Sequence, residues 1–531
     1  MFTKVLIANR GEIALRVIRA CRELGVRTVA VYSDVDATAP HVRAADEAVA
    51  IGGPRATESY LRGDALIAAA RRTGAEAIHP GYGFLSERAP FARAVRDAGL
   101  VWIGPPAEAI EALGSKTAAR TLAGGAGVPI VPGTTEPLRD AEEAGRIAAG
   151  FGYPVLLKAA AGGGGKGMRV VRSRAELAGA LDAARREALG AFGDDAVYVE
   201  KFIEGPRHVE IQVLGDTHGT MLSLGERECS VQRRHQKIIE EAPSVAVSPE
   251  RRRAMGETAV RAARAAGYVN AGTCEFLLDR DGRFYFLEMN TRIQVEHPVT
   301  ELVTGIDLVA WQLRIAAGER LPFRQEEIAP RGWALECRIT SEDPANGFLP
   351  STGRIAFLRA PSGAGVRWDG GIEPGSEVGL YYDPLLAKLI VWAPTRGEAV
   401  ARMRRALGEL VIDGVTTSRE LLLQILADEE FRSGSIDIHW LERRLASLVE
   451  RPPSPEALRA AAVAAALLTR ADTPSPRGAP GGGPPGAGDG HRPGGTGAAG
   501  VGPGSGASAN GDRIDGPSRW TSVARREAVR E

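Results

Sequence analysis

The stretch EMNTRIQVEHPVTE, residues 288–301, stands at the end of two runs typical of β-strands, TCEFLL (273–278) and RFYFLEMN (283–290). The Asp-Gly pair between these runs predicts a two-residue hairpin turn, because both central positions of a type I′ turn need positive φ. In that register Glu275 lies directly opposite Glu288, with the two Cβ atoms about 4.5–5.5 Å apart. A longer turn would move the two residues out of register.

Paired carboxylates repel each other, so this register predicts a cation between them or a proton on one of them. Asn290 follows on the same face of the second strand and adds a neutral oxygen. Oxygen ligands of this kind suit Mg²⁺ or Mn²⁺, which keep water and phosphate oxygens as their other ligands. We therefore expect Glu275, Glu288 and Asn290 to bind metal.

The residues after the second strand are too polar for the exit of a core strand. Arg292 can hold an anion, and Glu296, four positions later, can accept a proton; Gln294 and His297 lie beside them. For any one of these residues a solvated loop is the simpler explanation. The whole group beside paired glutamates favours a functional site.

Length and composition exclude several classes of protein. A chain of 531 residues holds two to four domains, and 66 basic against 66 acidic residues give no overall attraction to nucleic acid or membranes. Four dispersed cysteines without a CxxC pair fit a reducing compartment. The N-terminus becomes charged before a signal-type apolar segment forms, and the longest apolar run near the C-terminus, 460–468, is too short to cross a bilayer. We expect a cytoplasmic protein that binds neither nucleic acid nor a membrane.

The first part of the chain alternates strand and helix patterns, which predicts an open parallel sheet. KVLIAN (4–9) is a buried strand, a short turn follows, and 13–25 is a helix. The turn is not GxGxxG, so the dinucleotide fingerprint is absent. HPGYGFLSE (79–87) follows a later strand, where ligands bind in such sheets, and Tyr82 stands there between two glycines. A plain turn explains this segment equally well.

A glycine run lies between two strand patterns in YPVLLKAAAGGGGKGMRVV, residues 153–171. It is not a Walker A loop, because no Lys-Ser or Lys-Thr opens a following helix. Such a hairpin tip can still cover phosphates with its amide groups while a lysine on the strand neutralises charge. The alternative is a flexible linker. The phosphate-binding candidates are Lys158, Gly162, Gly163, Gly164, Gly165, Lys166 and Gly167.

The densest polar cluster, ERECSVQRRHQKIIEEAPS, spans residues 226–244. Its cationic and amide side chains cannot all be buried without partners. A nucleic-acid patch is one alternative and a solvated face another; the absence of aromatic neighbours and the adjacent Glu240 and Glu241 argue against the first.

Six motifs then stand in a fixed order: IANRGEIALR, HPGYGFLSE, KAAAGGGGKGM, QRRHQKIIEEAPS, EMNTRIQVEHPVTE and ALECRITSEDP. Together they resemble biotin carboxylase, the ATP-grasp component of acetyl-CoA carboxylase and of related acyl-CoA and pyruvate carboxylases. The resemblance covers about residues 1–447. It implies an α/β and α+β fold with a Rossmann-like pre-ATP-grasp domain (1–114), an ATP-grasp domain (115–331, flap at about 131–204) and a C-terminal biotin carboxylase domain (332–447).

The resemblance also implies roles for individual residues. ATP would bind between the flap and the body, with two Mg²⁺ or Mn²⁺ ions on Glu275, Glu288 and Asn290. Bicarbonate would bind Lys237, Arg292, Gln294 and the amide of Val295, with Glu296 as the base. Tyr82 and Gly83 would border biotin, and Arg338 would stabilise its enolate. The nucleotide set comprises Lys116, Lys158, the 162–167 tip, Glu200, Lys201, Ile203, His208, Gln232 and His235.

The implied reaction is ATP-dependent carboxylation of biotin through carboxyphosphate, the first half-reaction of acetyl-CoA carboxylase or a related enzyme of malonyl-CoA synthesis. None of the six methionines adjoins a lysine, so the biotin carboxyl carrier protein and the carboxyltransferase are expected to be separate chains. Family members pair as homodimers through residues matching Arg19, Glu23 and Arg367; Ala364 replaces a commonly aromatic interface residue.

Two alternative functions are a different ATP-grasp ligase and a catalytically silent ATP-binding scaffold of a carboxylase complex. The segments HPGYGFLSE and RIQVEH argue against the first, and the presence of every expected catalytic residue argues against the second. Residues 448–531 combine an Ala-rich helical pattern with a Pro- and Gly-rich tail that is predicted to be disordered, followed by a short segment of helical composition.

Overall fold

The computed structural model describes residues 1–134, 136–159, 168–449, 459, 462–463 and 466. The chain divides into two compact units, residues 1–450 and 451–531. The predictions for the glycine tip at 162–167 and for the C-terminal tail fall outside the described residues. Among the helices described, none has the length and apolar character needed to cross a membrane.

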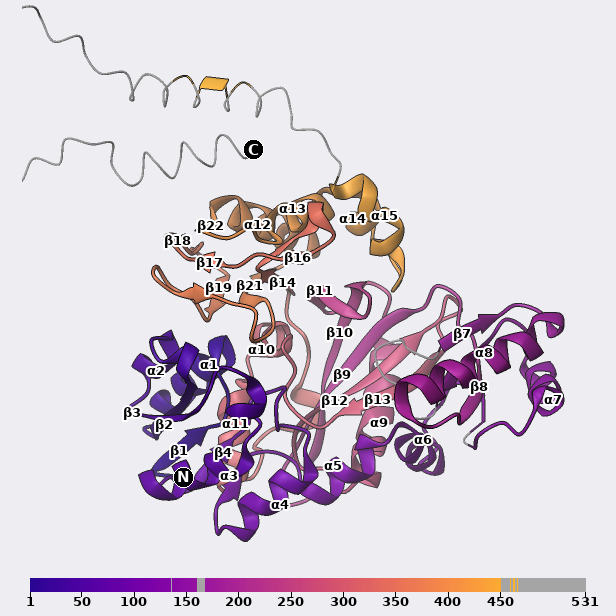
Figure 1. The fold of residues 1–531 in the computed structure, drawn as a ribbon, viewed down its shortest axis with the longest axis horizontal. Coiled ribbons are helices and arrows are strands. Elements are labelled where there is room, and N and C mark those ends of the chain that lie inside the picture. The colour runs from indigo at the N-terminus through magenta and orange to yellow at the C-terminus, as the bar shows by residue number, and fades with distance from the viewer. Residues whose placement is uncertain (135, 160–167, 450–458, 460–461, 464–465, 467–531) are drawn as a thin grey trace, which may run out of the picture. The chain divides into compact units, whose positions relative to one another are not determined.

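The N-terminal part forms the parallel sheet that its strand and helix alternation predicts (Figure 1). Its strand order is β3-β2-β1-β4-β5, and every neighbouring pair is parallel. Val5, Leu6 and Ile7 are completely buried because helices cover both faces of a parallel sheet. The elements are β1 (Lys4–Ile7), α1 (Gly11–Glu23), β2 (Arg27–Ser33), α2 (Pro40–Ala44), β3 (Glu47–Gly52), α3 (Gly63–Thr73), β4 (Ala77–His79), α4 (Ala89–Asp97), β5 (Val101–Trp102) and α5 (Ala107–Gly114).

A small antiparallel sheet, ordered β7-β6-β8, forms the predicted flap. Its strands flank the glycine run as the sequence pattern predicts, and α7 and α8 pack on it through Leu157, Leu177 and Leu181. The elements from this region are α6 (Lys116–Gly125), α7 (Ala141–Phe151), β6 (Val155–Ala159), β7 (Met168–Val171), α8 (Arg174–Phe192) and β8 (Val197–Lys201).

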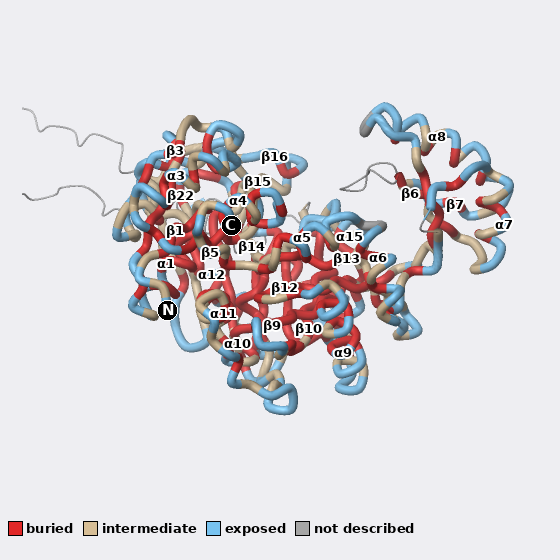
Figure 2. Tube along the Cα trace, turned by 90° about the horizontal axis from the view of Figure 1, so that it is seen from below, coloured by how far each residue is buried: buried red, intermediate tan, exposed pale blue. Residues whose placement is uncertain are grey.

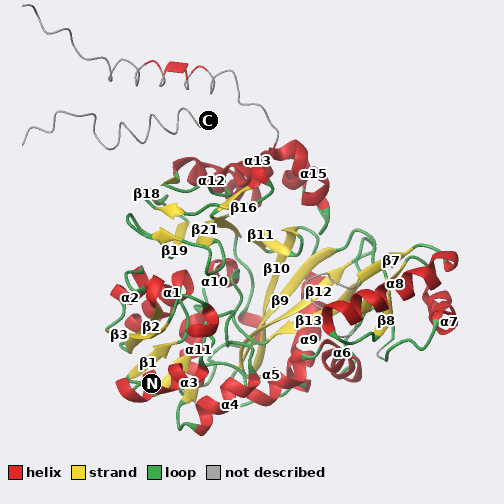
Figure 3. Ribbon diagram, in the orientation of Figure 1, coloured by secondary structure: helices red, strands yellow, loops and turns green. Residues whose placement is uncertain are grey.

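One antiparallel sheet of eight strands then joins the centre of the molecule to its C-terminal part (Figure 3). Its order is β13-β12-β9-β10-β11-β14-β21-β19. The predicted domain boundary at 331/332 falls between β11 and β14, yet these two strands pair directly, with Ile239 opposite Cys337. The sheet is therefore continuous across that boundary. Its strands are β9 (Arg207–Gly215), β10 (Met221–Arg233), β11 (Gln236–Ala242), β12 (Asn270–Leu278), β13 (Phe284–Asn290), β14 (Trp333–Thr340), β19 (Val366–Gly370) and β21 (Leu385–Ala393).

The β12–β13 hairpin confirms the predicted pairing of Glu275 with Glu288. The predicted two-residue turn is wrong. The amide of Asp279 donates to the carbonyl of Arg283 at 2.8 Å, which leaves a three-residue loop ending at Gly282 with φ +81°. An irregularity next to Glu275 then restores the expected register.

Helices cover the large sheet, and buried residues fill the interior between them (Figure 2). Trp440, Met403 and Leu407 pack against Leu389 of β21 in the largest apolar cluster. The remaining elements are α9 (Pro249–Ala265), α10 (His297–Thr304), α11 (Leu308–Ala316), β15 (Glu342–Asp343), β16 (Leu349–Pro350), β17 (Gly353–Arg354), β18 (Phe357–Arg359), β20 (Glu377–Val378), α12 (Arg396–Glu409), β22 (Val411–Asp413), α13 (Arg419–Ala427), α14 (Glu429–Ser433) and α15 (Trp440–Val449), with four single 3₁₀ turns, Asp34–Asp36, Ala56–Glu58, Gln325–Glu327 and Pro344–Asn346.

Candidate active site

A cavity of about 860 Å³ collects most of the predicted site residues. The side chain of Lys116 and the tip at 162–167 are not among those described, and Glu296 lies fully buried just behind the cavity wall. The predicted residues in the wall are Tyr82, Gly83, Lys158, Glu200, Lys201, Ile203, His208, Gln232, His235, Lys237, Glu275, Glu288, Asn290, Arg292, Gln294, Val295 and Arg338.

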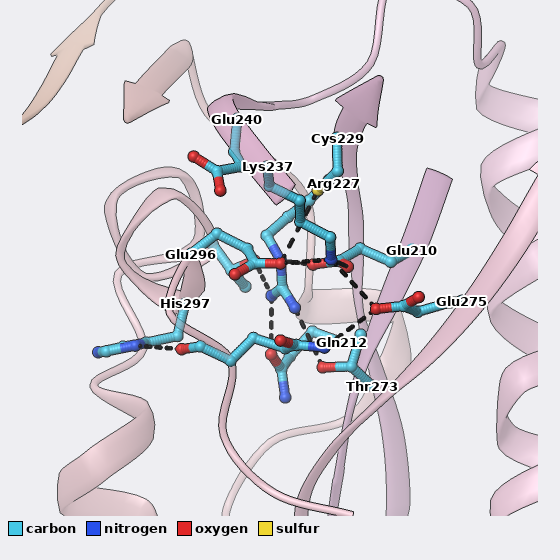
Figure 4. Close-up of polar contacts among 12 residues, drawn as sticks. Glu210, Gln212, Arg227, Cys229, Lys237, Glu240, Thr273, Glu275, Glu296 and His297 are labelled. Atoms are coloured by element: carbon cyan, nitrogen blue, oxygen red, sulfur yellow. Dashed lines mark hydrogen bonds and ion pairs between the residues drawn. The ribbon is translucent and has the colours of Figure 1, made fainter. Parts of the chain in front are cut away.

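The ammonium group of Lys237, on β11, is the centre of the polar network (Figure 4). It lies 2.6 Å from Glu210 Oε2, 2.6 Å from Glu296 Oε1 and 3.1 Å from Glu275 Oε1. Burial alone would lower the pKa of Lys237, but these three carboxylates raise it well above its usual range. Lys237 is therefore a permanent cation at neutral pH.

Glu296 binds two cations, one through each oxygen. Its Oε1 contacts Lys237, and its Oε2 accepts from Arg338 Nη2 at 2.8 Å. Burial would raise the pKa of Glu296, but the charges of Lys237, Arg338 and the fully buried Arg227 hold it well below its usual range. The carboxylate is thus ionised and able to accept a proton, and it becomes a stronger base when another anion competes for its two cations.

Arg338, which lies on β14, also reaches Glu240. Its Nε donates to Glu240 Oε1 at 2.6 Å, while Nη2 donates to Glu296. The guanidinium is therefore held between two carboxylates, with one edge toward the cavity. A strand residue predicted only by resemblance thus lies beside the predicted base.

Arg292 lines the cavity from the loop after β13. Its Nε donates to Glu87 Oε2 at 2.9 Å, Nη1 to Gln294 Oε1 at 2.9 Å and Nη2 to Asn290 Oδ1 at 3.0 Å. Glu87 ends the HPGYGFLSE segment, so that segment holds Arg292 in place as well as bordering the cavity.

The expected metal ligands lie together on the β12–β13 hairpin. Glu275 and Glu288 are opposite each other, and Asn290 Nδ2 donates to Glu275 Oε1 at 2.9 Å. Burial would raise the pKa of Glu275, but Lys237 and His208 lower it, so the carboxylate is ionised without a metal. Adjacent carboxylate and amide oxygens in the wall of a cavity fit Mg²⁺ or Mn²⁺.

On the predicted nucleotide side, Glu200 bridges two cations from different elements. Its Oε1 lies 2.6 Å from Arg120 Nη1, and its Oε2 accepts from Lys158 Nζ at 2.8 Å. Lys201 Nζ instead donates to the carbonyls of Gly152 and Tyr153. The ammonium of Lys201 is thus used for packing within the flap, which leaves its backbone on the cavity side.

Several residues of the network were missed from the sequence. Glu210 and Arg227 hold Lys237 and the sheet together: Arg227 Nη1 donates to Gln212 at 2.7 Å and to Thr300 at 2.9 Å. The alternation of polar residues in HVEIQV, with His208, Glu210 and Gln212 on one face, is a signal that would have found Glu210. Ile438 and His439 enter the cavity from far along the chain and carry no local signal.

Three family models match consecutive parts of the chain: "Biotin carboxylase, N-terminal domain" over residues 1–110, "Carbamoyl-phosphate synthase L chain, ATP binding domain" over 115–324, and "Biotin carboxylase C-terminal domain" over 336–443. Biotin carboxylase 1 of Bacillus subtilis is 51% identical over 443 residues, which cover 83% of this chain and 98% of that protein. The chain belongs to the biotin carboxylase family.

Other relatives are named after different carboxylated substrates, including 2-oxoglutarate, pyruvate and propionyl-CoA. The 2-oxoglutarate carboxylase small subunit of Hydrogenobacter thermophilus is 52% identical over 442 residues, which cover 83% of this chain and 93% of that one. The crystal structure of its biotin carboxylase domain dimer, in complex with MgADP, ADP and bicarbonate, has a TM-score of 0.79 at 50% identity and covers 85% of this chain and 100% of that one. A Campylobacter jejuni biotin carboxylase–β,γ-ATP complex has the same TM-score at 46% identity, over 83% of this chain and 99% of that one.

These matches confirm the predicted family, the ATP-grasp fold and the assignment as an ATP-dependent ligase. Biotin carboxylases use ATP, Mg²⁺ and biotin, and they act with carrier and carboxyltransferase components. The assignment of individual site residues remains a prediction.

Proposed function

We propose that this enzyme carboxylates biotin on a separate carrier protein, using bicarbonate and ATP with two Mg²⁺ or Mn²⁺ ions, through carboxyphosphate. The observation that carries the proposal is the contact series Lys237–Glu296–Arg338. Its two cations line one cavity beside the paired glutamates of the β12–β13 hairpin, and Glu296 is buried just behind the wall of that cavity. An anion-binding lysine, a base and an enolate-stabilising arginine are the groups that this chemistry needs.

Bicarbonate would bind between Lys237, Arg292, Gln294 and Val295. Its negative charge competes with Glu296 for the ammonium of Lys237, which in the structure lies 2.6 Å from the glutamate. Losing this ion pair raises the pKa of Glu296 and makes the carboxylate a better proton acceptor. Substrate binding would thus activate the base.

Phosphoryl transfer from ATP to the deprotonated bicarbonate needs charge neutralisation more than covalent help from the protein. Glu275, Glu288 and Asn290 would hold the divalent ions, which neutralise charge on the transferring phosphoryl group. Lys158 and Lys116 would supply further positive charge on the nucleotide side. The remaining nucleotide contacts would come from Glu200, Lys201, Ile203, His208, Gln232 and His235, with the tip at 162–167 over the phosphates.

Biotin would bind against Tyr82 and Gly83, with its ureido oxygen toward Arg338. The resulting enolate carries negative charge on that oxygen, and a guanidinium already fixed by Glu240 and Glu296 stabilises it without reorganisation. The phosphate released with CO₂ would take the ureido proton.

We also propose the cellular location and the assembly of the enzyme. We infer a cytoplasmic homodimer that provides the first half-reaction of an acetyl-CoA or related acyl-CoA carboxylase, with the carboxyltransferase choosing the acceptor. In the structure Arg367 already pairs with Glu301 and Asp369, each at 2.7 Å, and Arg19 lies 4.0 Å from Asp369. A dimer interface there would add to an existing ion-pair cluster.

The test measures ADP formation from ATP and Mg²⁺, with and without bicarbonate and free biotin. We expect biotin-stimulated turnover that requires bicarbonate, and its near-complete loss in Glu296→Ala with nucleotide binding retained. Well-folded enzyme without biotin-stimulated turnover would show a silent ATP-binding scaffold instead. A near-normal rate for Glu296→Ala would remove Glu296 from the role of base.

A further inference from the structure

One face of the large sheet carries a buried row of charged side chains behind the cavity. Glu240 on β11 lies directly opposite Glu336 on β14, and two residues later in β14 Arg338 lies opposite Lys388 on β21. Cβ atoms of directly opposed residues are about 4.5–5.5 Å apart. Glu240, Glu336 and Lys388 are each 0% exposed. Two acidic side chains thus face each other in the protein interior.

Hydrogen bonds are distributed unevenly over this acidic pair. Oε1 of Glu240 accepts from Arg338 at 2.6 Å. Among the described residues, none donates to Oε2 of Glu240 or to either oxygen of Glu336. Three buried carboxyl oxygens therefore lack a donor, and buried polar groups are rarely left in that condition.

The cations close to the pair already have other partners. Lys388 Nζ lies 3.2 Å from Glu12 and donates to the carbonyl of Val295 at 2.9 Å. Arg338 divides its donors between Glu240 and Glu296, and Lys237 contacts Glu210, Glu275 and Glu296. The charged groups that face the pair are thus Arg338, Lys388, Glu296, Glu12 and Lys237. These cations are shared with other acidic groups, including Asp369 opposite Lys388, so two ionised carboxylates in this row would leave excess negative charge.

The electrostatic environment agrees with this geometry. Burial raises the pKa of Glu336 well above its usual range, against the opposing charge of Lys388. Burial also raises the pKa of Glu240 to about 7, because the neighbouring Arg338 offsets only part of the effect. When two like charges share a buried site, one of them takes up a proton.

We propose that Glu336 is a protonated carboxylic acid that donates a hydrogen bond to Oε2 of Glu240 and thereby keeps Glu240 ionised against Arg338. Glu336 is then a positioning residue, since it acts on the active-site arginine only through Glu240. The shared hydrogen bond satisfies Oε2 of Glu240 and leaves one net negative charge to match the guanidinium. A neutral donor is the one partner that adds no second charge.

The consequence for turnover rests on the proposed function. Arg338 is held by carboxylates on both sides only when Glu240 is ionised as well as Glu296, so kcat/KM for biotin rises as pH rises through the pKa of Glu240. Removing the donor at position 336 leaves the Glu240 anion with an unpaired oxygen and raises that pKa. The acidic limb of the profile then moves to higher pH.

The test compares Glu336→Leu, which removes the donor at similar volume, with Glu336→Gln, which keeps a neutral donor. The full-length enzyme is assayed with free biotin, and melting temperature monitors folding. We expect the midpoint of the acidic limb to move up by about one pH unit in Glu336→Leu, a tenfold change in the ionisation constant. We expect Glu336→Gln to keep the wild-type midpoint of the acidic limb.

Glu241→Gln is the matched control. Glu241 is equally buried and adjacent on β11, but it points to the opposite face, where it accepts from Trp333 at 2.6 Å and from Arg396 at 2.7 Å. This change should lower the melting temperature and leave the pH midpoint in place. The same midpoint in wild type, Glu336→Leu and Glu336→Gln would overturn the proposal. An equal shift in both variants at position 336 would also overturn it, and an equal downward shift would indicate an ionised Glu336.

Infrared spectroscopy of the unliganded enzyme tests protonation without any activity. The carbonyl stretching band of a buried protonated carboxyl group should be present at pH 8 in wild type and absent in Glu336→Gln. Identical spectra would overturn the proposal even if the enzyme carboxylates biotin. A missing biotin reaction together with the expected band would instead refute the proposed function alone.

Discussion

Two hairpins build the walls of this active site, and they relate to their sequences in opposite ways. The β12–β13 hairpin carries a strong turn signal, Asp281-Gly282, but turns through three residues with an irregularity further along. The β10–β11 hairpin carries no turn signal. Even so, Arg233 pairs with Gln236, and the two residues between them both have positive φ, +47° and +67°.

The difference shows that tertiary contacts can outweigh the local conformational preference of a turn sequence, because that preference is small. In the β10–β11 hairpin, Arg233 lies over the ring of Phe348 at 3.9 Å, and the amide of Arg234 donates to Glu442 at 3.0 Å. Both partners come from more than a hundred residues later in the chain. The β10–β11 hairpin that presents Lys237 is therefore stabilised by contacts from the C-terminal part of the protein, whereas the β12–β13 hairpin is stabilised by its own pairing and by the pairing of β12 with β9.

Lys237→Met, in the β10–β11 hairpin, is expected to have the largest effect on turnover and on stability. Loss of the cation leaves Glu210, Glu275 and Glu296 around an uncharged side chain. We expect biotin-dependent turnover to fall by about 10²–10³-fold and the free energy of unfolding by about 3–5 kcal/mol.

The loss of stability in Lys237→Met should depend on pH with a defined sign. In the native protein the pKa values of Glu275 and Glu296 are depressed, so their contribution to stability is present above pH 4.5 and is lost as pH falls. The difference between wild type and variant should therefore be greatest near pH 7 and shrink toward pH 4, as measured by urea unfolding. A difference that does not vary with pH would contradict the ion-pair account.

The next largest effect is expected for a substitution in the β12–β13 hairpin. Glu288→Gln removes one charge opposite Glu275 while keeping its shape, so we expect the Mg²⁺ concentration for half-maximal turnover to rise by about 10–100-fold. Stability should change little. Equal Mg²⁺ requirements in variant and wild type, from titrations at saturating ATP, would remove Glu288 from the metal site.

Gly282→Ala tests the turn with the strong sequence signal. At φ +81° an alanine is strained, and its Cβ would also meet the Arg251 guanidinium. We expect a loss of about 1–2 kcal/mol in the free energy of unfolding, with unchanged turnover because this turn lies at the far end of the strands from Glu288. A neutral substitution would mean that the loop adopts another conformation.

The smallest effect is expected for Arg234→Gly, which should raise the free energy of unfolding rather than lower it. Its positive φ costs an arginine about 1–2 kcal/mol, while glycine adds unfolded-state entropy of about 0.4–1 kcal/mol. The net expectation is a gain of up to about 1 kcal/mol in denaturant unfolding. A loss of stability would show that the arginine side chain itself stabilises the turn.

Much of the site could be predicted because its residues lie close together in the chain. Glu288 to Glu296 form one segment. The two-residue turn register predicted Glu275 opposite Glu288, and this pairing occurs because the irregularity next to Glu275 compensates for the longer loop. Arg338 and His208 depended on resemblance. A single polar residue in a strand, such as Arg338, carries no local signal. Glu87, Glu210 and Glu240 were missed because they act on other site residues rather than on a recognisable motif.

The sequence by itself determined the N-terminal parallel sheet, the β12–β13 hairpin and the set of chemical groups, because strand and helix periodicity and short motifs are local properties. Only the tertiary structure decided how the charges are shared: that Lys237 faces three carboxylates, that Arg338 lies between Glu240 and Glu296, and that the sheet runs unbroken from β11 into β14. The physical reason is that Coulomb energies depend on distance and burial, and these are set by packing between segments far apart in the chain.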